Sequence, residues 1–248
     1  MSPFLLMEKK RLHAIYITAI SVLGVTALSL GAALIATNLP ESPKSGMQQY
    51  YDEKVAAFGM ENSNFSKGQI VFIGDSITDL YPLGDYYSDL DLMTYNRGIG
   101  GDTTKGVLKR MDVSLYAIQP TKVVLMIGIN DINGGVPFKE TSNNYKAILD
   151  GIKTNLPNTV TYCMSILPMS DKILEVAQVD IPGQNQKVRE MNEEIKPIIA
   201  DHGYTYLDLY SLVQDENQKL RNELTDDGIH LNGNGFAIWT NLVKPYLM

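Results

Sequence analysis

Five short runs of apolar and β-branched residues recur along the chain after residue 68, and turn-forming residues separate them from longer segments with helical periodicity. The runs occupy Gln69–Gly74, Leu92–Asn96, Lys122–Ile127, Thr159–Leu167 and Tyr204–Leu209. Because the runs are apolar almost throughout rather than at alternate positions, they indicate strands that are buried on both faces, as in a parallel sheet.

Apolar residues spaced by three and four predict helices between these runs. One apolar face extends over residues 107–118, a second over 145–156 and a third over 188–199, and a last helix follows Asn232. The alternation of strands and helices predicts right-handed crossovers and a three-layer α/β/α domain. We expect a five-stranded parallel sheet in a flavodoxin-like order, in which ligands bind beyond the carboxyl ends of the strands.

The N-terminal part of the chain has a different pattern. Residues 12–39 carry no fixed charge, and this stretch is longer than the roughly 20 helical residues that span a bilayer. The basic residues 9–11 precede it, so the positive-inside rule predicts a cytoplasmic N-terminus and export of everything that follows. Gly31 and Ala33 keep open the alternative of a cleaved signal peptide, which would release the remainder as a secreted protein.

These patterns divide the chain into four parts. We expect a cytoplasmic basic tip at 1–11, a single transmembrane anchor at 12–39, a stalk and lead-in at 40–67 and an extracytoplasmic α/β domain at 68–248. The formal net charge is −7, and residues 1–39 contribute +2, which leaves −9 for the remainder. An acidic domain of this kind argues against nucleic acid as a partner.

A candidate nucleophile follows the first predicted strand, in Gly74-Asp75-Ser76-Ile77-Thr78. A nucleophilic serine needs an exposed hydroxyl on a tight turn, and the glycine permits such a turn. Taken alone, the segment is more typical of an ordinary turn. It is also not the Gly-x-Ser-x-Gly elbow of the α/β-hydrolases.

Two further blocks follow the second and third predicted strands. In residues 98–104, clustered glycines let a backbone N–H approach a substrate atom, and Asp102 is placed to cap the next helix, whose start favours an oxyanion. A tight connection without a ligand and a phosphate loop are the alternatives, although no Gly-Lys-Ser/Thr follows. In residues 128–131, the Asn130 amide either donates to the same oxyanion or satisfies local backbone groups.

The search for a general base is short, because the chain has three histidines. His13 lies at the predicted membrane boundary, and His202 is placed at a helix end. His230 follows Asp227 by three residues, in a loop before the last predicted helix. At this spacing, one carboxylate can hold the imidazole in the tautomer that leaves its other nitrogen free.

Together, these blocks resemble the SGNH, or GDSL-type, hydrolase family over the whole α/β domain. The glycine block is especially similar to platelet-activating-factor acetylhydrolase-like and carbohydrate O-acetylesterase-like members. The resemblance implies Ser76 as nucleophile, His230 as general base and Asp227 as the residue that orients the base. It also implies an oxyanion hole made of the backbone N–H groups of Ser76 and Gly101 and the side chain of Asn130.

The resemblance implies a serine esterase that forms an acyl-serine and requires neither a metal nor an organic cofactor. The single cysteine, Cys163, lies in an apolar run, which predicts a buried and unreactive thiol. The expected substrates are small esters or acylated carbohydrates and lipids at the membrane, with O-acetyl groups on carbohydrate as the first candidate. A lysophospholipase or lipid esterase, an acyltransferase with the same three residues and a non-catalytic binding module are the alternatives.

Overall fold

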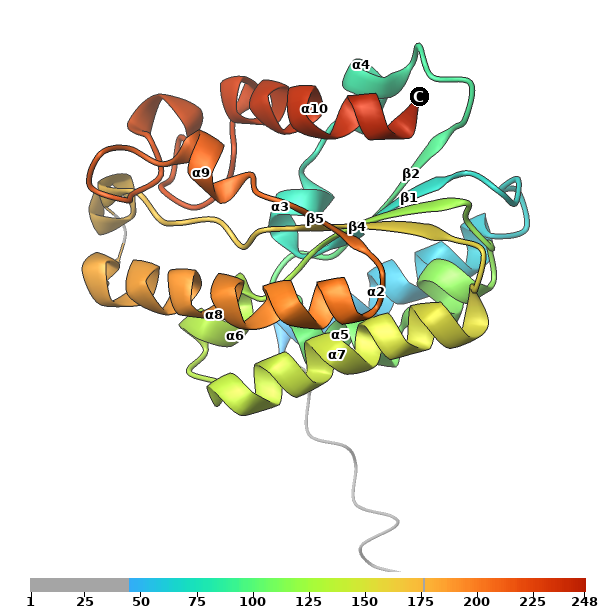
Figure 1. Cartoon of the computed structure of the whole chain (residues 1–248), viewed down its shortest axis with the longest axis horizontal. Helices are drawn as coiled ribbons and strands as arrows, with labels where there is room; N and C mark the ends of the chain where they lie inside the picture. The colour runs from blue at the N-terminus through green and yellow to red at the C-terminus, as the bar shows by residue number, and fades with distance from the viewer. Residues whose placement is uncertain (1–44, 176) are drawn as a thin grey trace, which may run out of the picture. The chain divides into compact units, whose positions relative to one another are not determined.

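The computed structural model describes residues 45–175 and 177–248, and residues 46–248 form one compact unit. Within this unit, helices cover both faces of a central five-stranded sheet (Figure 1). The predicted transmembrane anchor at 12–39 lies outside the described residues. Among the residues that are described, no helix is both long enough and apolar enough to cross a membrane.

The sheet follows the apolar runs of the sequence. Its strands are β1 (Ile70–Gly74), β2 (Thr94–Gly98), β3 (Lys122–Met126), β4 (Val160–Met164) and β5 (Thr205–Leu207). They lie in the order β2-β1-β3-β4-β5, and every neighbouring pair is parallel. The predicted flavodoxin-like order is therefore confirmed, and the carboxyl ends of all five strands lie at one edge of the sheet.

β2 lies two residues further along the chain than the run Leu92–Asn96 predicted. The displacement brings Arg97 into the strand, where its side chain is completely buried. The guanidinium lies over the rings of Phe58 and Phe65, 4.3 and 4.8 Å from their centroids, and pairs with Glu61 at 2.6 Å. These partners allow a charged side chain inside the strand. A search for apolar runs ends the strand before Arg97, because arginine is not apolar.

The helices form two layers (Figure 1). One face of the sheet is covered by α5 (Thr104–Lys109), α7 (Phe138–Asn155) and α8 (Ile181–Asp201), and the other by α4 (Leu83–Tyr87) and α10 (Gly233–Leu247). Short helices follow three of the strands, namely α3 (Ser76–Asp79), α6 (Ile129–Asn133) and α9 (Tyr210–Val213). A π-helical segment lies at Asp112–Tyr116, and 3-10 segments lie at Asp171–Glu175 and Asn222–Leu224.

Among the long helices of the described residues, α2 (Gly46–Glu61) was not predicted by hydrophobic periodicity. It lies in the segment 40–67 that was expected to be a stalk and lead-in. Phe58 is its one buried residue, so α2 has no apolar stripe that a sequence pattern can detect. Polar contacts attach it instead, among them a 2.8 Å hydrogen bond from the Tyr51 hydroxyl to the carbonyl of Gly106.

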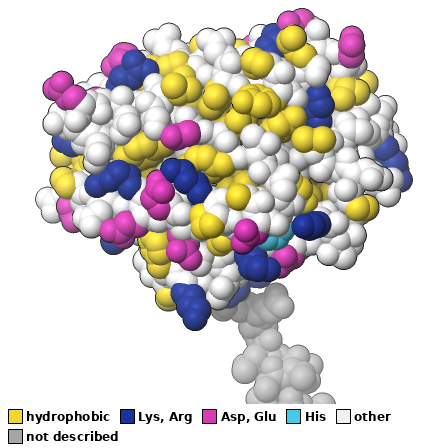
Figure 2. Space-filling model, viewed as in Figure 1, with side chains coloured by type: hydrophobic (Ala, Val, Ile, Leu, Met, Phe, Trp, Pro, Cys, Tyr) yellow, Lys and Arg dark blue, Asp and Glu magenta, His cyan; other side chains and the backbone are white. Residues whose placement is uncertain are grey.

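The predicted burial of the single cysteine is confirmed, and the charged side chains on the surface are mixed in sign. Cys163 is completely buried, and burial raises the pKa of its thiol to about 12, so the thiol stays protonated and unreactive at neutral pH. On the face drawn in Figure 2, acidic and basic side chains are interspersed and do not form a continuous basic surface of the kind that binds nucleic acid.

Candidate active site

The described structure brings three of the sequence blocks together because β1 lies between β2 and β3. α3 begins at Ser76 directly after β1, the glycine loop 99–103 follows β2, and Asn130 lies in α6 after β3. Parallel strands that are neighbours end at the same edge of the sheet, so these segments meet there. The fourth block, at Asp227–His230, reaches this edge from the segment before α10.

The Ser76 hydroxyl and the His230 imidazole are in direct contact. Nε2 of His230 lies 2.8 Å from Oγ of Ser76, although 154 positions separate the two residues in the chain. The other ring nitrogen, Nδ1, lies 2.5 Å from Oδ2 of Asp227. Ser76 and His230 are both partly exposed, so a substrate can reach the hydroxyl.

Two backbone N–H groups hold the Asp227 carboxylate in place beside the imidazole. Its Oδ1 accepts hydrogen bonds from the backbone N–H of Ile229 at 2.9 Å and of His230 at 2.8 Å. Partial burial raises the pKa of Asp227, but the hydrogen bonds from the His230 ring and from the two backbone N–H groups outweigh it and lower the pKa to about 2. The carboxylate is therefore ionised at neutral pH and can stabilise an imidazolium.

A glycine between these two residues fixes the turn. Gly228 has a φ of 91°, and a Cβ at this position would lie 2.3 Å from the backbone nitrogen of Ile173. Its carbonyl accepts a 2.8 Å hydrogen bond from the backbone N–H of Ser170. The segment around the 3-10 helix at 171–175 therefore supports the turn that carries Asp227 and His230.

The turn before Ser76 is equally tight. A Cβ on Gly74 would lie 2.1 Å from the carbonyl oxygen of Met126, so β1 and β3 approach closely at this point. Asp75 caps α3, since its Oδ1 accepts a 3.0 Å hydrogen bond from the N–H of Ile77. This cap places Ser76 at the first position of the helix, where backbone N–H groups are free of intrahelical partners.

Asn130 lies against the glycine loop. Its Nδ2 donates to the carbonyl of Asp102 at 2.8 Å, and the second hydrogen of the same amide remains for another acceptor. The neighbouring Asp131 accepts a 2.9 Å hydrogen bond from the N–H of Thr104, which ties α6 to the start of α5. Gly101, in the same loop, has a φ of 75°, a conformation that glycine adopts without strain.

The expected role of Asp102 as the cap of α5 is wrong. Thr103 caps this helix, and its hydroxyl accepts from the N–H of Gly106 at 3.2 Å. The Asp102 carboxylate is instead buried against Arg110, with 2.8 Å between Oδ2 and Nε. The other carboxylate oxygen, Oδ1, accepts a 2.8 Å hydrogen bond from the N–H of Thr103, so both oxygens have partners other than the first-turn N–H groups of α5.

Two polar residues that organise this region were not recognised from the sequence. Arg110 lies within residues 107–118 but was not one of the apolar residues of the predicted helix face. It is nevertheless buried, and a buried charge requires partners. Asn96 donates to the carbonyls of Thr78 at 2.7 Å and Tyr81 at 3.1 Å and so holds the end of α3. Its polar character inside a predicted strand was the available signal.

Within residues 45–175 and 177–248, no group of three or more His, Cys, Asp and Glu side chains is arranged to hold a metal ion.

Comparisons with known proteins identify the family of the chain. The model of the GDSL-like lipase/acylhydrolase family matches residues 72–238, a range that contains all four blocks. The alpha2 subunit of platelet-activating factor acetylhydrolase IB from Homo sapiens is 28% identical over 186 residues, which cover 71% of this chain and 73% of the relative. The alpha1 subunit from Bos taurus is 28% identical over 144 residues, which cover 57% of this chain and 58% of the relative.

Solved structures share the fold. A Streptococcus pneumonia chain, provisionally described as a platelet activating factor, has a TM-score of 0.75 at 25% identity, covering 89% of this chain and 99% of that one. The acetylxylan esterase Axe2 from Geobacillus stearothermophilus has a TM-score of 0.57 at 19% identity, covering 73% and 94%, a likeness that concerns the fold alone. The family match spans most of the chain, and the protein therefore belongs to the GDSL-like lipase/acylhydrolase family and is a hydrolase that acts on esters.

Proposed function

We propose that the protein is a membrane-anchored, extracytoplasmic serine esterase that removes short acyl groups, foremost O-acetyl, through an acyl-serine intermediate. The observation that carries the catalytic assignment is the continuous hydrogen-bonded series from Asp227 through His230 to Ser76, with 2.8 Å between Nε2 and Oγ. A serine, an imidazole and a carboxylate in this order form an activated nucleophile.

In the proposed reaction, His230 Nε2 takes the hydroxyl proton as Ser76 Oγ attacks the ester carbonyl. The N–H groups of Ser76 and Gly101 and the free amide hydrogen of Asn130 stabilise the oxyanion. Collapse of the tetrahedral intermediate breaks the ester bond, and the leaving alkoxide takes the proton from His230. Water, deprotonated by the same imidazole, then attacks the acyl-serine, releases the carboxylic acid and restores the Ser76 hydroxyl.

The names of the relatives support the proposal of an acetyl group. The curated relatives are named acetylhydrolases, and one structural neighbour is named an acetylxylan esterase. Both names therefore specify an acetyl group, although the molecule that bears it differs. This common feature supports acetyl esters as substrates here. We place the acetyl group on a carbohydrate, because an exported esterase encounters acylated polysaccharide.

The membrane location is supported by the sequence. The uncharged stretch at 12–39 has the length of a bilayer-spanning helix, and the basic residues 9–11 precede it. The compact unit begins at Gly46, so few residues separate the proposed anchor from the catalytic unit. Since an anchored esterase would act at the membrane surface, an acetylated or short-chain lipid is the second candidate substrate. Protease protection in sealed vesicles whose cytoplasmic face is outward tests the orientation. The catalytic unit should be protected there, and its cleavage would contradict the proposed export.

The function is tested with the full chain in detergent, comparing wild type with Ser76→Ala. Hydrolysis of p-nitrophenyl esters from acetate to decanoate should be fastest for acetate, and Ser76→Ala should lower kcat by roughly 10³–10⁶. Ser211→Ala, at an exposed position on α9, is the matched control and should retain full activity. Undiminished hydrolysis by Ser76→Ala would overturn the assignment.

The carrier of the acetyl group requires a second comparison. Release of acetate from acetylated xylo-oligosaccharide and from an acetylated phospholipid in vesicles separates the two candidate substrates. An added sugar acceptor separates hydrolysis from acyl transfer, because a transferase would form the acylated acceptor in place of free acetate. Binding of the oligosaccharide without turnover would support a non-catalytic module instead.

A further inference from the structure

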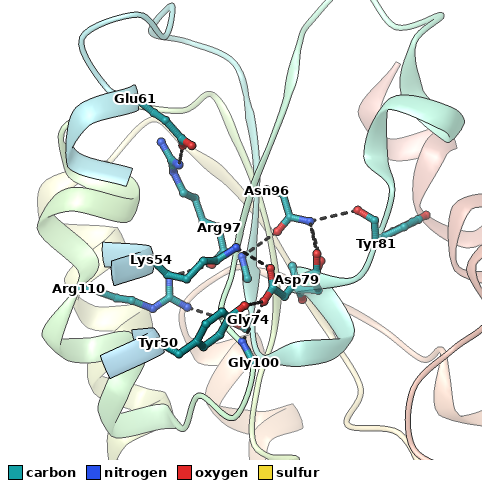
Figure 3. A network of polar contacts seen from close by, with 12 residues as sticks. Tyr50, Lys54, Glu61, Gly74, Asp79, Tyr81, Asn96, Arg97, Gly100 and Arg110 are labelled. Carbon is teal, nitrogen blue, oxygen red and sulfur yellow. Dashed lines mark hydrogen bonds and ion pairs between the residues drawn. The ribbon is translucent and has the colours of Figure 1, made fainter. Parts of the chain in front are cut away.

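The carboxylate of Asp79 joins α3 to the glycine loop after β2 and to α2 (Figure 3). Asp79 is the last residue of α3, and its side chain is only 14% exposed. Oδ2 accepts a hydrogen bond from the N–H of Gly100 at 3.1 Å and another from the Tyr50 hydroxyl. Oδ1 accepts from Nζ of Lys54 at 2.7 Å. One carboxylate therefore connects three elements that come from different parts of the chain.

The loop that receives this hydrogen bond contains the proposed oxyanion donor. The direction of the Gly101 N–H depends on the torsions of Gly100, and a glycine has no strong conformational preference of its own. Contacts from α2 supply the missing restraint. A Cβ on Gly100 would lie 3.3 Å from the Tyr50 ring, and a Cβ on Gly101 would lie 2.2 Å from the methyl group of Met47. α2 therefore covers the loop directly.

Both ends of the loop are anchored to the ends of β1 and β2 and to the segment after α5. The N–H of Ile99 donates to the carbonyl of Gly74 at 3.1 Å, and the Asp102 carboxylate pairs with buried Arg110. Between these anchors, the Gly100 N–H extends towards α3 and bonds to Asp79. The loop is thus fixed at both ends by the fold itself, while its middle is fixed through a side chain that α2 holds.

The charges of this group also matter for an oxyanion. An unpaired carboxylate beside the loop would oppose the negative charge that develops during acyl transfer. Lys54 supplies the compensating positive charge to Asp79. Partial burial and the hydrogen bond to Asp79 raise the pKa of Tyr50 to about 12, so its hydroxyl remains a donor at neutral pH.

We propose that Tyr50, Lys54 and Asp79 form a clamp through which α2 positions the Gly101 N–H for oxyanion stabilisation. The clamp residues are positioning residues, and the inference rests on the proposed role of Gly101. α2 precedes the range 72–238 that the family model matches, so the functional enzyme unit extends further towards the N-terminus than that range.

Substitutions in the full chain test the clamp. Asp79→Ala should lower kcat for p-nitrophenyl acetate by about 10²-fold, and Lys54→Met and Tyr50→Phe by about 10-fold each, because misplacing a reacting group by about 1 Å has effects of this size. KM should change less than 3-fold. Lys54→Arg, which keeps the charge, should restore most of the rate. The double variant Lys54→Met/Asp79→Asn should be more active than Lys54→Met, because the uncompensated carboxylate is gone.

Lys146→Met is the matched control, because Lys146 forms an exposed 2.7 Å pair with Asp150 on α7. A readout specific to the oxyanion comes from an aryl boronic acid, which forms a tetrahedral adduct with an active serine. Its inhibition constant should rise in proportion to the loss of kcat in the clamp variants and stay unchanged in Lys146→Met. Rates are expressed per folded molecule, determined from thermal unfolding of each variant.

The possible outcomes separate the clamp from the esterase assignment. Wild-type kcat and boronate affinity in folded Lys54→Met and Tyr50→Phe would overturn the clamp, even if Asp79→Ala fails to fold. A loss of activity that follows the folded fraction alone would overturn it as well. If a fluorophosphonate labels Ser76 in the wild type, the esterase assignment stands whatever the clamp variants do. Failure to label the wild type would instead contradict the proposed function.

Discussion

Arg110 and Asp102 form an ion pair that is almost completely buried, with 2.8 Å between Nε and Oδ2 and side-chain exposures of 0% and 2%. The same guanidinium donates to the carbonyl oxygens of Gly74 at 2.9 Å and Arg97 at 2.8 Å. It therefore ties the end of β1, the end of β2 and the glycine loop into one unit. This unit is the scaffold on which Ser76 and Gly101 are placed.

Replacing Arg110 with methionine should strongly destabilise the protein. The Asp102 carboxylate and two carbonyl oxygens would lose a buried donor, and such a loss costs about 3–5 kcal/mol of the free energy of unfolding. Urea denaturation of the full chain measures this change. The double variant Arg110→Met/Asp102→Leu should recover part of the loss, because no unpaired carboxylate remains. An Arg110→Met protein as stable as the wild type would show that the pair is dispensable.

Asp75 should make stability depend on pH. Burial is the main cause that raises the pKa of this carboxyl to about 7, and its Oδ2 makes no hydrogen bond within the described residues. The folded pKa lies above the ordinary value of 3.8, so the folded state binds the proton more tightly than the unfolded chain. This contribution to stability is complete below about pH 3.8 and is lost as the pH rises through about 7.

The measurement for Asp75 compares wild type with Asp75→Asn between pH 4 and 8. The difference in unfolding free energy between the two proteins should change by at most about 1.4 kcal/mol per pH unit below about pH 7 and level off above that pH. Subtracting the variant removes the contribution of the other carboxylates. A difference that does not vary with pH would contradict a raised pKa for Asp75.

Asn130→Ala should lower kcat by about 10²–10³ while KM changes little, because the amide would act on the oxyanion and not on the ground-state ester. The same substitution also removes the 2.8 Å bond to the Asp102 carbonyl. Asn144→Ala is a suitable control, since the Asn144 amide donates to Thr104 at 3.2 Å in the neighbouring helix. Equal losses in both variants would mean that Asn130 supports the loop and does not act on the substrate.

Asp227→Asn should lower kcat on the order of 10⁴ with the fold intact. The asparagine oxygen can still accept from the backbone N–H groups of Ile229 and His230, so the turn is retained. Its amide would then donate towards Nδ1 of His230 and move the ring proton to Nε2, which faces the Ser76 hydroxyl. Steady-state kinetics and thermal unfolding of the variant together separate this effect from misfolding. A rate within 10-fold of the wild type would argue against Asp227 as the orienting residue.

Periodicity predicted the sheet well and the attachment of α2 not at all. Buried strands leave a continuous apolar run in the sequence, whereas α2 binds through Tyr50, Tyr51, Lys54 and the contact of Glu61 with Arg97. Each of these residues is equally typical of an exposed helix. Their partners lie in other helices and strands, so the local sequence pattern does not predict that α2 packs against the domain.

The sequence by itself predicted the strand order and the three blocks that follow β1, β2 and β3, because buried strands and tight turns restrict residue type locally. The resemblance of its motifs to a known family implied Ser76, His230 and Asp227 as the reactive residues. Only the tertiary structure decided which polar side chains meet. It paired Asp102 with Arg110 and made Thr103 the cap of α5, and it brought Tyr50 and Lys54 of α2 to Asp79. Such pairings depend on the burial and direction of two side chains distant in the chain, and these are set only when the layers pack.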